Sequence, residues 1–252
     1  MPKIRVMPTL LFKDVGLVKG VAFDSWRRVG SAMQAVKVYN MREVDELVYL
    51  DITATSDGRP PDFETVDDLA DECFMPLTVG GGVRTLEHVR RLLKVGADKV
   101  AVNTAAVEQP ALIREIADRF GSQCVVVSID ARRRPDGTYE TFTHAGRQPV
   151  GKDPASLAKD AEAMGAGEIL LTSIDRDGTL QGYDVELTRL VCDAVSIPVI
   201  ASGGAGTYAH MADVLRDGRA SAVAAASMYH FTEQTPFAAK QYLREAGFSV
   251  RL

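Results

Sequence analysis

Two glycine-rich runs with nearly the same sequence are the clearest sign of chemistry in this chain. The first is Pro76-Leu-Thr-Val-Gly-Gly-Gly82, and the second, 122 residues later, is Pro198-Val-Ile-Ala-Ser-Gly-Gly204. Each apolar run predicts a buried strand, and the glycines that end it let a ligand approach the backbone closely. Bare amide N–H groups at such a turn suit a phosphate or another anion. One copy alone would fit an ordinary strand-to-helix turn equally well, but the repetition favours two anion sites.

The strand ends beyond these runs carry small polar residues that fall into two groups. Gly82, Asn103 and Thr104 are expected to form one pocket rich in N–H groups. A second pocket, on the opposite side of the same mouth, is expected from Gly178, Gly203, Gly204 and Ser227. Two such pockets predict an elongated ligand with a phosphate at each end. The alternative is that short loops favour Gly, Ser, Thr and Asn in any case.

Eight short apolar segments predict the strands that would position these residues. They are 5–10, 46–52, 77–79, 99–103, 125–129, 168–173, 199–202 and 222–226. Amphipathic stretches between them predict helices at 31–40, 65–73, 85–95, 110–120, 154–164, 184–194, 208–216 and 235–246. Eight β-then-α units are typical of an α/β fold of the (β/α)8 TIM-barrel type. A doubly wound open sheet is the alternative, and it is disfavoured because eight near-equal units leave no obvious edge strand.

Local signals mark where several of these helices begin and end. Thr85, Asp184 and Thr207 are expected to cap helix N-termini. Glycines follow the predicted C-termini of four helices, where a left-handed residue commonly ends a helix. These are Gly96, Gly121, Gly165 and Gly218.

The repeat extends over the whole chain and predicts two half-barrels, roughly 1–122 and 123–252. The offset is 122 residues at most positions but 119 at the first strand of each half, which implies about three extra residues in a turn-like loop at 132–137. Four parallel strands alone would expose their faces and edges. We therefore expect one closed domain, 1–252.

Four charged residues stand at the other end of the predicted strands. Arg5, Glu46, Lys99 and Glu168 each lie at a strand start. Because strand side chains alternate, Lys99 shares a face with Asn103, and Arg5 with position 11. If that face is the inner one, the four charges form a neutral ring at the base of the barrel. Without further information, a stabilising rim cluster is the simpler interpretation.

Composition excludes several classes of function. The 252 residues carry a net charge of -5, which argues against nucleic acid and anionic membranes as partners. Three scattered cysteines fit a reducing compartment, and they lack metal-ligand spacing. No signal peptide and no apolar run of membrane-spanning length is recognisable. We expect a cytoplasmic protein without a bound metal or cofactor.

Essentially end to end, the chain resembles the cyclase subunit of imidazole glycerol phosphate synthase. The residues that carry the resemblance are Gly16-Leu-Val-Lys-Gly20, the segment 45–54, Thr78-Val-Gly-Gly-Gly82, the segments 96–106 and 165–179, and Ala201-Ser-Gly-Gly-Ala205. The resemblance implies a duplicated half-barrel that binds a ribulose-type substrate with two phosphates. It also implies a separate glutaminase subunit, which supplies ammonia through the barrel for imidazole ring formation.

The resemblance also assigns roles to individual residues. Lys19, Asp51 and Asp177 join the expected substrate-binding set. The charges at 5, 46, 99 and 168 match the ammonia gate beneath which the glutaminase docks, and Asp98 and Gln123 match the same face.

The catalytic positions depart from the family pattern. Two aspartates are expected to act as general acid and base; Asp130 matches one, but Leu11 stands where the other belongs. Loss of one member of such a pair typically lowers the reaction rate by a factor of roughly 10²–10⁴ or more. Without a like-charged partner, we expect Asp130 to titrate as an ordinary carboxylate.

Three functions are compatible with a chain that matches the ammonia gate but lacks one of the two catalytic aspartates. The first is a synthase subunit of histidine biosynthesis with reduced or altered cyclase activity. The second is a paralogue from surface-polysaccharide biosynthesis, which resembles this chain at Pro8-Thr-Leu-Leu11 and conducts ammonia to a third, amidino-sugar-forming enzyme. The third is a non-catalytic activator of the glutaminase.

Overall fold

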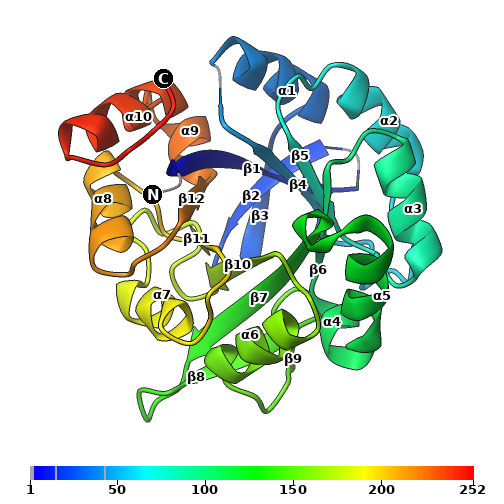
Figure 1. Cartoon of the computed structure of the whole chain (residues 1–252). Helices are drawn as coiled ribbons and strands as arrows, with labels where there is room; N and C mark the ends of the chain where they lie inside the picture. Colours follow the sequence, from blue (N-terminus) through cyan, green and yellow to red (C-terminus); the bar gives the residue numbers. More distant parts are fainter. Residues whose placement is uncertain (1–2, 15, 43) are drawn as a thin grey trace.

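Eight parallel strands close into a barrel in the computed structural model, which describes residues 3–14, 16–42 and 44–252 (Figure 1). In order around the ring they are β1 (Arg5–Lys13), β4 (Leu47–Asp51), β5 (Leu77–Gly80), β6 (Lys99–Val102), β7 (Val125–Arg133), β10 (Glu168–Ser173), β11 (Val199–Ser202) and β12 (Ala222–Ala225). Parallel pairing of β12 with β1, and of β7 with β10, leaves no free edge in this ring. The predicted (β/α)8 fold is confirmed.

Helices follow the barrel strands and surround them in a ring, as predicted (Figure 1). The main ones are α1 (Ala32–Met41), α2 (Phe63–Asp71), α3 (Leu86–Lys94), α5 (Ala111–Phe120), α6 (Pro154–Ala163), α7 (Val185–Cys192), α8 (Tyr208–Arg216) and α10 (Pro236–Glu245). Single turns also follow β6 and β12 directly, as α4 (Thr104–Glu108) and α9 (Ser227–Phe231), and a 3-10 turn, η1 (Ser122–Cys124), precedes β7. None of the described helices is long and apolar enough to cross a membrane.

The predicted helix caps form as the sequence indicates. The side chains of Thr85, Asp184 and Thr207 each accept a hydrogen bond from the amide three residues ahead. This contact satisfies one of the free amides at each helix start.

Three of the four predicted helix-ending glycines adopt positive φ angles. They are Gly96, Gly121 and Gly165. The prediction for Gly218 is wrong, because Arg219 takes the left-handed conformation there instead. Gly218 is required for another reason: a Cβ atom on it would lie 2.6 Å from the carbonyl oxygen of Val214.

Two hairpins depart from the predicted simple alternation of strand and helix. β1 continues beyond residue 10 and pairs with β2 (Gly16–Val21), which pairs with β3 (Asp24–Gly30). β7 continues beyond residue 129 and pairs with β8 (Tyr139–Thr143), followed by the short β9 (Gln148–Pro149). The loop expected at 132–137 is therefore too long, because Arg132 and Arg133 belong to β7 and the turn begins after them.

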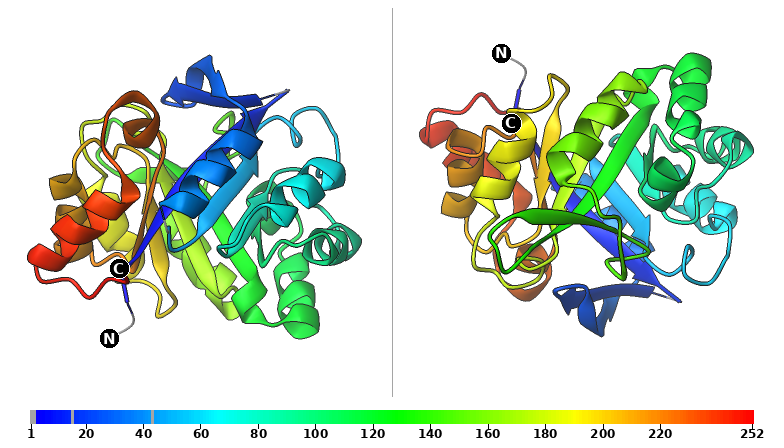
Figure 2. Two further views of the ribbon diagram at one scale, coloured as in Figure 1. Left: turned by 90° about the horizontal axis from the view of Figure 1, so that it is seen from above. Right: turned by 90° about the horizontal axis from the view of Figure 1, so that it is seen from below.

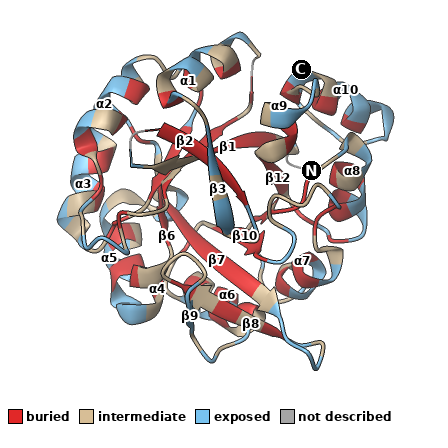
Figure 3. Cartoon of the chain, turned by 180° about the vertical axis from the view of Figure 1, so that it is seen from behind, coloured by how far each residue is buried: buried red, intermediate tan, exposed pale blue. Residues whose placement is uncertain are grey.

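The β2–β3 hairpin crosses the end of the barrel opposite the N-terminus (Figures 2 and 3). β2 is buried against the barrel, apart from its last residue, whereas most residues of β3 are exposed. The carboxyl ends of the eight strands meet at this end, so the hairpin partly covers the mouth where a (β/α)8 barrel has its functional site.

An apolar layer fills the middle of the barrel between base and mouth. Its buried members are Met7, Val48, Ala101, Val126, Leu170, Ile200, Ala222 and Ala224. Separate apolar clusters pack the outer strand faces against the helices. Inward-facing residues are thus charged at the base, apolar in the middle and polar at the mouth.

Candidate functional site

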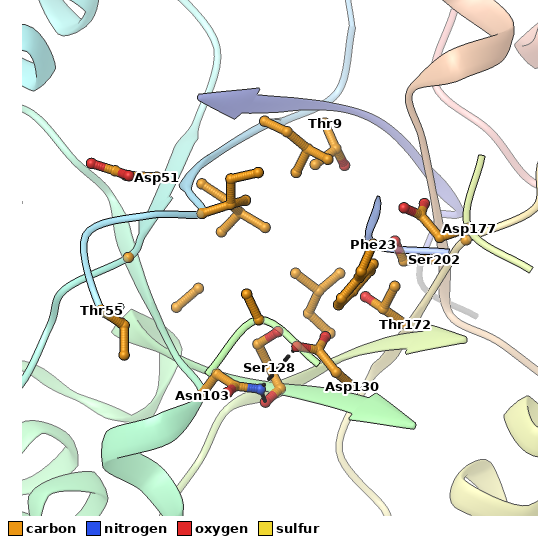
Figure 4. A pocket seen from close by; sticks show the side chains of 18 of the residues that line it. Thr9, Phe23, Asp51, Thr55, Asn103, Ser128, Asp130, Thr172, Asp177 and Ser202 are labelled. Atoms are coloured by element: carbon orange, nitrogen blue, oxygen red, sulfur yellow. Dashed lines mark hydrogen bonds between the residues drawn. The ribbon is translucent and has the colours of Figure 1, made fainter. Parts of the chain in front are cut away.

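A cavity of about 430 Å³ opens at the mouth and takes lining residues from all eight barrel units (Figure 4). Asp130, Asn103 and Asp177 line it, and so do Leu11 and both glycine runs. Residues of the two expected pockets therefore share one cavity: Gly82, Asn103 and Thr104 with Gly178, Gly203, Gly204 and Ser227.

Leu11 and Asp130 occupy equivalent places in the two half-barrels. On β1, Thr9 is paired with Val48 and Leu11 with Leu50 of the next strand. On β7, Ser128 is paired with Leu170 and Asp130 with Thr172. The offsets between these two sets are 119 on the first strand and 122 on the second, as the repeat predicts. An apolar side chain thus stands in the mouth at the position that corresponds to the buried carboxyl.

Asp130 has a specific hydrogen-bonding environment. The side-chain amide of Asn103 donates to Asp130 Oδ2 over 3.3 Å and to the carbonyl of Ser128 over 3.0 Å. Burial, and secondly the negative charge of Asp177, raise the pKa of Asp130 to about 7. The expectation of an ordinary carboxylate is wrong, because loss of water raises the pKa of a buried acid even without a partner at position 11.

The first glycine run owes its conformation to close contact with the loop after β4. Gly81 and Gly82 have φ angles of 105° and 71°, and a Cβ atom on Gly81 would lie 2.2 Å from the carbonyl oxygen of Asp51. The amide of Gly82 has a long hydrogen bond of 3.4 Å to Thr55 Oγ1. These glycines are therefore required by packing, and the amide of Gly82 has only a weak partner.

Asp51 lines the cavity, but loop groups already hydrogen-bond its carboxylate. Oδ1 accepts from the amides of Thr53 and Ala54, each at 3.0 Å, and Oδ2 accepts from Arg59 at 3.3 Å. The structure thus gives Asp51 a role in shaping the loop beside the first glycine run.

The second glycine run packs equally closely against its surroundings. A Cβ atom on Gly204 would lie 2.2 Å from the carbonyl oxygen of Gly182, and one on Gly178 would lie 2.0 Å from that of Gly20. Gly178 therefore lets the β2–β3 hairpin rest directly on the loop after β10. The amide of Ala22 donates to the carbonyl of Asp177 over 2.9 Å in the same contact.

Lys19 and Asp177 are buried titratable residues next to this contact, and each affects the pKa of the other. Lys19 Nζ donates to the carbonyl of Thr9 over 2.9 Å, and Lys19 is not among the residues that line the cavity. Burial lowers the pKa of Lys19 to about 7, and Asp177 opposes that shift. Burial raises the pKa of Asp177 to about 6, against the effect of Lys19. In this structure Lys19 thus binds the barrel itself, on the side of the second glycine run.

Several residues that line the mouth were not predicted from the sequence. Phe23 and Trp26 come from the β2–β3 hairpin, and His144 comes from the turn between β8 and β9. The hairpin lacks a glycine at its turn, where Ala22 and Phe23 have φ angles of 50° and 63°, so it gave no turn signal. In contrast, Gly146, two residues after His144, is a residue type that indicates a turn. Thr9, Ser128, Thr172 and Ser202 also line the cavity, and strand alternation from Leu11 and Asp130 would have found Thr9 and Ser128.

The four charges at the strand starts form one cluster at the base. Arg5 contacts Glu46 at 2.8 Å and Glu168 at 3.0 Å, and Lys99 contacts the same two carboxylates at 2.9 and 3.0 Å. Thr78 donates a further hydrogen bond of 2.7 Å to Glu46. Glu46 is almost completely buried, and two cationic side chains and a hydroxyl group contact its carboxyl oxygens.

Asp98 and Gln123 both make hydrogen bonds to the backbone near the base. Asp98 accepts from the amide of Leu77 at 2.8 Å, and Gln123 donates to the carbonyl of Phe120 at 3.2 Å. In the part of the chain that the structure describes, no group of three or more His, Cys, Asp or Glu side chains is arranged to hold a metal ion.

The fold and the mouth define a class: a (β/α)8 barrel with a cavity at the strand carboxyl ends that both glycine runs line. A comparison with family models makes the assignment more specific. Residues 5–235 match the family described as histidine biosynthesis protein, and this chain belongs to that family. Its members are barrel enzymes of histidine biosynthesis.

Proposed function

We propose that this chain is the synthase subunit of a glutamine-dependent enzyme of the imidazole glycerol phosphate synthase type. In this proposal a separate glutaminase docks on the face that carries the strand starts. Ammonia passes from there to a bis-phosphorylated ribulosyl ligand at the mouth. The observation that supports it best is the joint presence of a paired four-charge cluster at one end of the barrel and an anion-suited cavity at the other.

The interior between the two ends suits a small neutral molecule. Ammonia carries no charge, so its transfer from water into an apolar passage costs far less free energy than the transfer of ammonium. The middle layer contains Ala101, Ala222 and Ala224, whose small side chains occupy little of the barrel interior. At the base, Lys99 bridges the carboxylates of Glu46 and Glu168, so in this proposal its movement would open the entrance.

At the mouth, the two glycine runs would hold the two phosphates of the ligand, with Asp130 between them. A carboxyl with a pKa of about 7 is partly protonated at neutral pH, so it can both give and accept a proton. Asn103 holds this carboxyl in place. Leu11 supplies no second proton-transferring group, so ring formation is expected to be slow or absent in this chain.

Leu11 favours a second candidate function. A barrel that keeps the ammonia gate and the ligand pockets, but lacks one acid/base group, is suited to conducting ammonia to a third enzyme, such as a sugar amidotransferase of surface-polysaccharide biosynthesis. A purely non-catalytic activator of the glutaminase would need neither Asp130 nor its hydrogen bond from Asn103.

One experiment separates these functions. The purified chain is given ammonium and the ribulosyl bisphosphate substrate, and substrate loss is followed for the parent, Leu11→Asp and Leu11→Asn. We expect little turnover by the parent, a gain with Leu11→Asp and no gain with Leu11→Asn, which matches Asp in shape but cannot act as a general acid or base. Turnover by the parent at the rate of an ordinary cyclase would contradict the role given to Leu11.

If none of the three variants turns over, glutaminase stimulation is measured with the partner subunit. Stimulation that survives would then support the channel or the activator in place of the cyclase. Absence of both activities would contradict the proposed function.

A further inference from the structure

A second cavity of about 220 Å³ lies outside the mouth, between α1, α9 and the base of the β2–β3 hairpin. It runs along one face of α1, because its α1 residues recur at helical spacing from Ser31 to Arg42. Leu17 and Val29 of the hairpin and Val38 of α1 give it an apolar floor. The groove therefore takes its lining residues from α1, early in the chain, and from α9, near its end (both labelled in Figure 1).

The polar groups around this groove have few partners in the protein. The hydroxyl of Tyr229 and Nε2 of His230 are buried and make no hydrogen bond to any described residue. Buried polar groups normally have a partner, so two neighbouring exceptions call for an explanation. Ser31, the N-cap residue of α1, makes no side-chain capping bond either. At the far end of the helix, no ion pair joins Arg42 to a carboxylate of the described residues.

The groove is also separate in chemistry from the mouth. Burial, and secondly the charge of Lys19, lower the pKa of His230 to about 4, so its imidazole is neutral at physiological pH. Among the described residues that line the groove, Arg42 is then the cation. A planar guanidinium binds a carboxylate well, with two parallel hydrogen bonds.

We propose that this groove is a binding site for a small carboxylate with a compact apolar or aromatic body. Arg42 binds the carboxylate, the apolar floor covers the body, and Tyr229 and His230 are the nearby hydrogen-bonding groups. The volume lies below the usual range for drug-sized ligands, so the ligand is small. The site shares α9 with the mouth, since Ser227 begins the helix that carries Tyr229 and His230.

The test is a titration of the full chain with benzoate, followed by NMR of methyl groups. We expect saturable shifts of the methyl signals of Leu17, Val29 and Val38. The methyl signals of Leu11 and Leu50 report on the mouth, which they line, and are expected to shift less. Benzamide, which has the same shape without the charge, is expected to bind at least about fivefold more weakly.

Two variants make the assignment specific. Arg42→Gln is expected to weaken benzoate binding at least about fivefold, whereas Arg119→Gln, at the exposed end of α5, leaves it unchanged. Tyr229→Phe is expected to keep or raise the Tm of the free chain, because it removes a buried hydroxyl without a partner.

Three results would overturn the proposal. They are no saturable shift at Leu17, Val29 and Val38, equal affinity of benzoate for the parent and Arg42→Gln, and equal affinity for benzoate and benzamide. A lower Tm of Tyr229→Phe would show that the hydroxyl has a structural partner and would remove it from the site.

Discussion

Leu11 and Asp130 stand at equivalent positions of the two half-barrels, each paired in the same register with its neighbouring strand. Both line the mouth, yet only Asp130 has a group that can give or accept a proton, and burial raises its pKa to about 7. The two backbone positions thus correspond in register while the side chains differ in chemistry. Five predictions follow from the geometry around this pair, from the glycine runs and from the base.

The burial of Asp130 makes stability depend on pH. Its folded pKa, about 7, lies above the ordinary value of 3.8, so the fold favours the neutral acid. This contribution is fully present below pH 3.8 and is lost as pH rises from there to 7, because only the unfolded chain ionises freely. Asp130→Asn should therefore gain stability over the parent between pH 4 and 8, by at most about 4 kcal/mol. Chemical denaturation of the parent and of Asp130→Asn at pH 4 and pH 8 checks this. An equal difference in their free energies of unfolding at the two pH values would contradict it.

Asp177 is the second cause of the raised pKa of Asp130. Asp177→Asn should lower the pKa of Asp130 below 7, though burial keeps it above the ordinary value. The same change should lower the pKa of Lys19 further, because Asp177 opposes the effect of burial there. Titration by NMR of the Asp130 carboxyl carbon measures the first effect. Asp175→Asn is the control, since Asp175 is exposed and makes its ion pair with Arg132.

Gly81 tests whether the first glycine run is required for folding. Gly81→Ala combines a φ angle of 105° with a Cβ atom 2.2 Å from a backbone oxygen, so it should cost at least about 3 kcal/mol. Gly58→Ala is the matched control: its φ angle is 70°, but nothing lies within 4 Å of the added atom. That variant should cost about 1 kcal/mol. The free energy of unfolding of both variants is measured by urea denaturation. A similar loss of stability in the two would mean that the positive φ angle, and not the close contact, causes it.

Lys99→Met tests whether the four-charge cluster at the base contributes to stability and to the passage of ammonia. Lys99→Met leaves Glu46 and Glu168 with Arg5 as their remaining cation in the cluster, and should destabilise the chain by about 1–3 kcal/mol, discounted for partial exposure. In the Leu11→Asp background, where turnover is expected, and with a glutaminase partner, we expect Lys99→Met to lower glutamine-driven activity while ammonium-driven activity stays. Lys94→Met, at the exposed end of α3, should change neither. Equal loss of both activities would place Lys99 outside the ammonia path.

The two glycine runs should act together on one ligand. A ribulosyl bisphosphate should raise the Tm more than the corresponding monophosphate at equal concentration, because one molecule would occupy both ends of the cavity. Ser227→Ala should reduce that difference. Differential scanning fluorimetry measures both effects, and equal shifts for the two ligands would show that the ends are not used at once.

The sequence alone determined much of this protein. Eight alternating apolar and amphipathic segments indicated the closed barrel, since that arrangement leaves no exposed strand edge. Strand alternation placed Lys99 and Asn103 on one face, and Arg5 and Leu11 on one face, because side chains two residues apart share a face. Their positions along the strands placed the two cations at one end and the other two residues at the opposite end. The family resemblance identified position 11 as the place where a second aspartate is expected.

Only the tertiary structure decided how these groups behave. The pKa of Asp130 depends on loss of water and on Asp177, which is 47 positions away in the chain. The placement of Phe23 at the mouth depends on a hairpin turn formed by non-glycine residues with positive φ angles, which local propensity does not indicate. The groove beside Arg42 exists because α1, α9 and the hairpin meet in space. Local pattern fixes which face a side chain takes, whereas burial, charge interactions and contacts between distant segments appear only when the barrel closes.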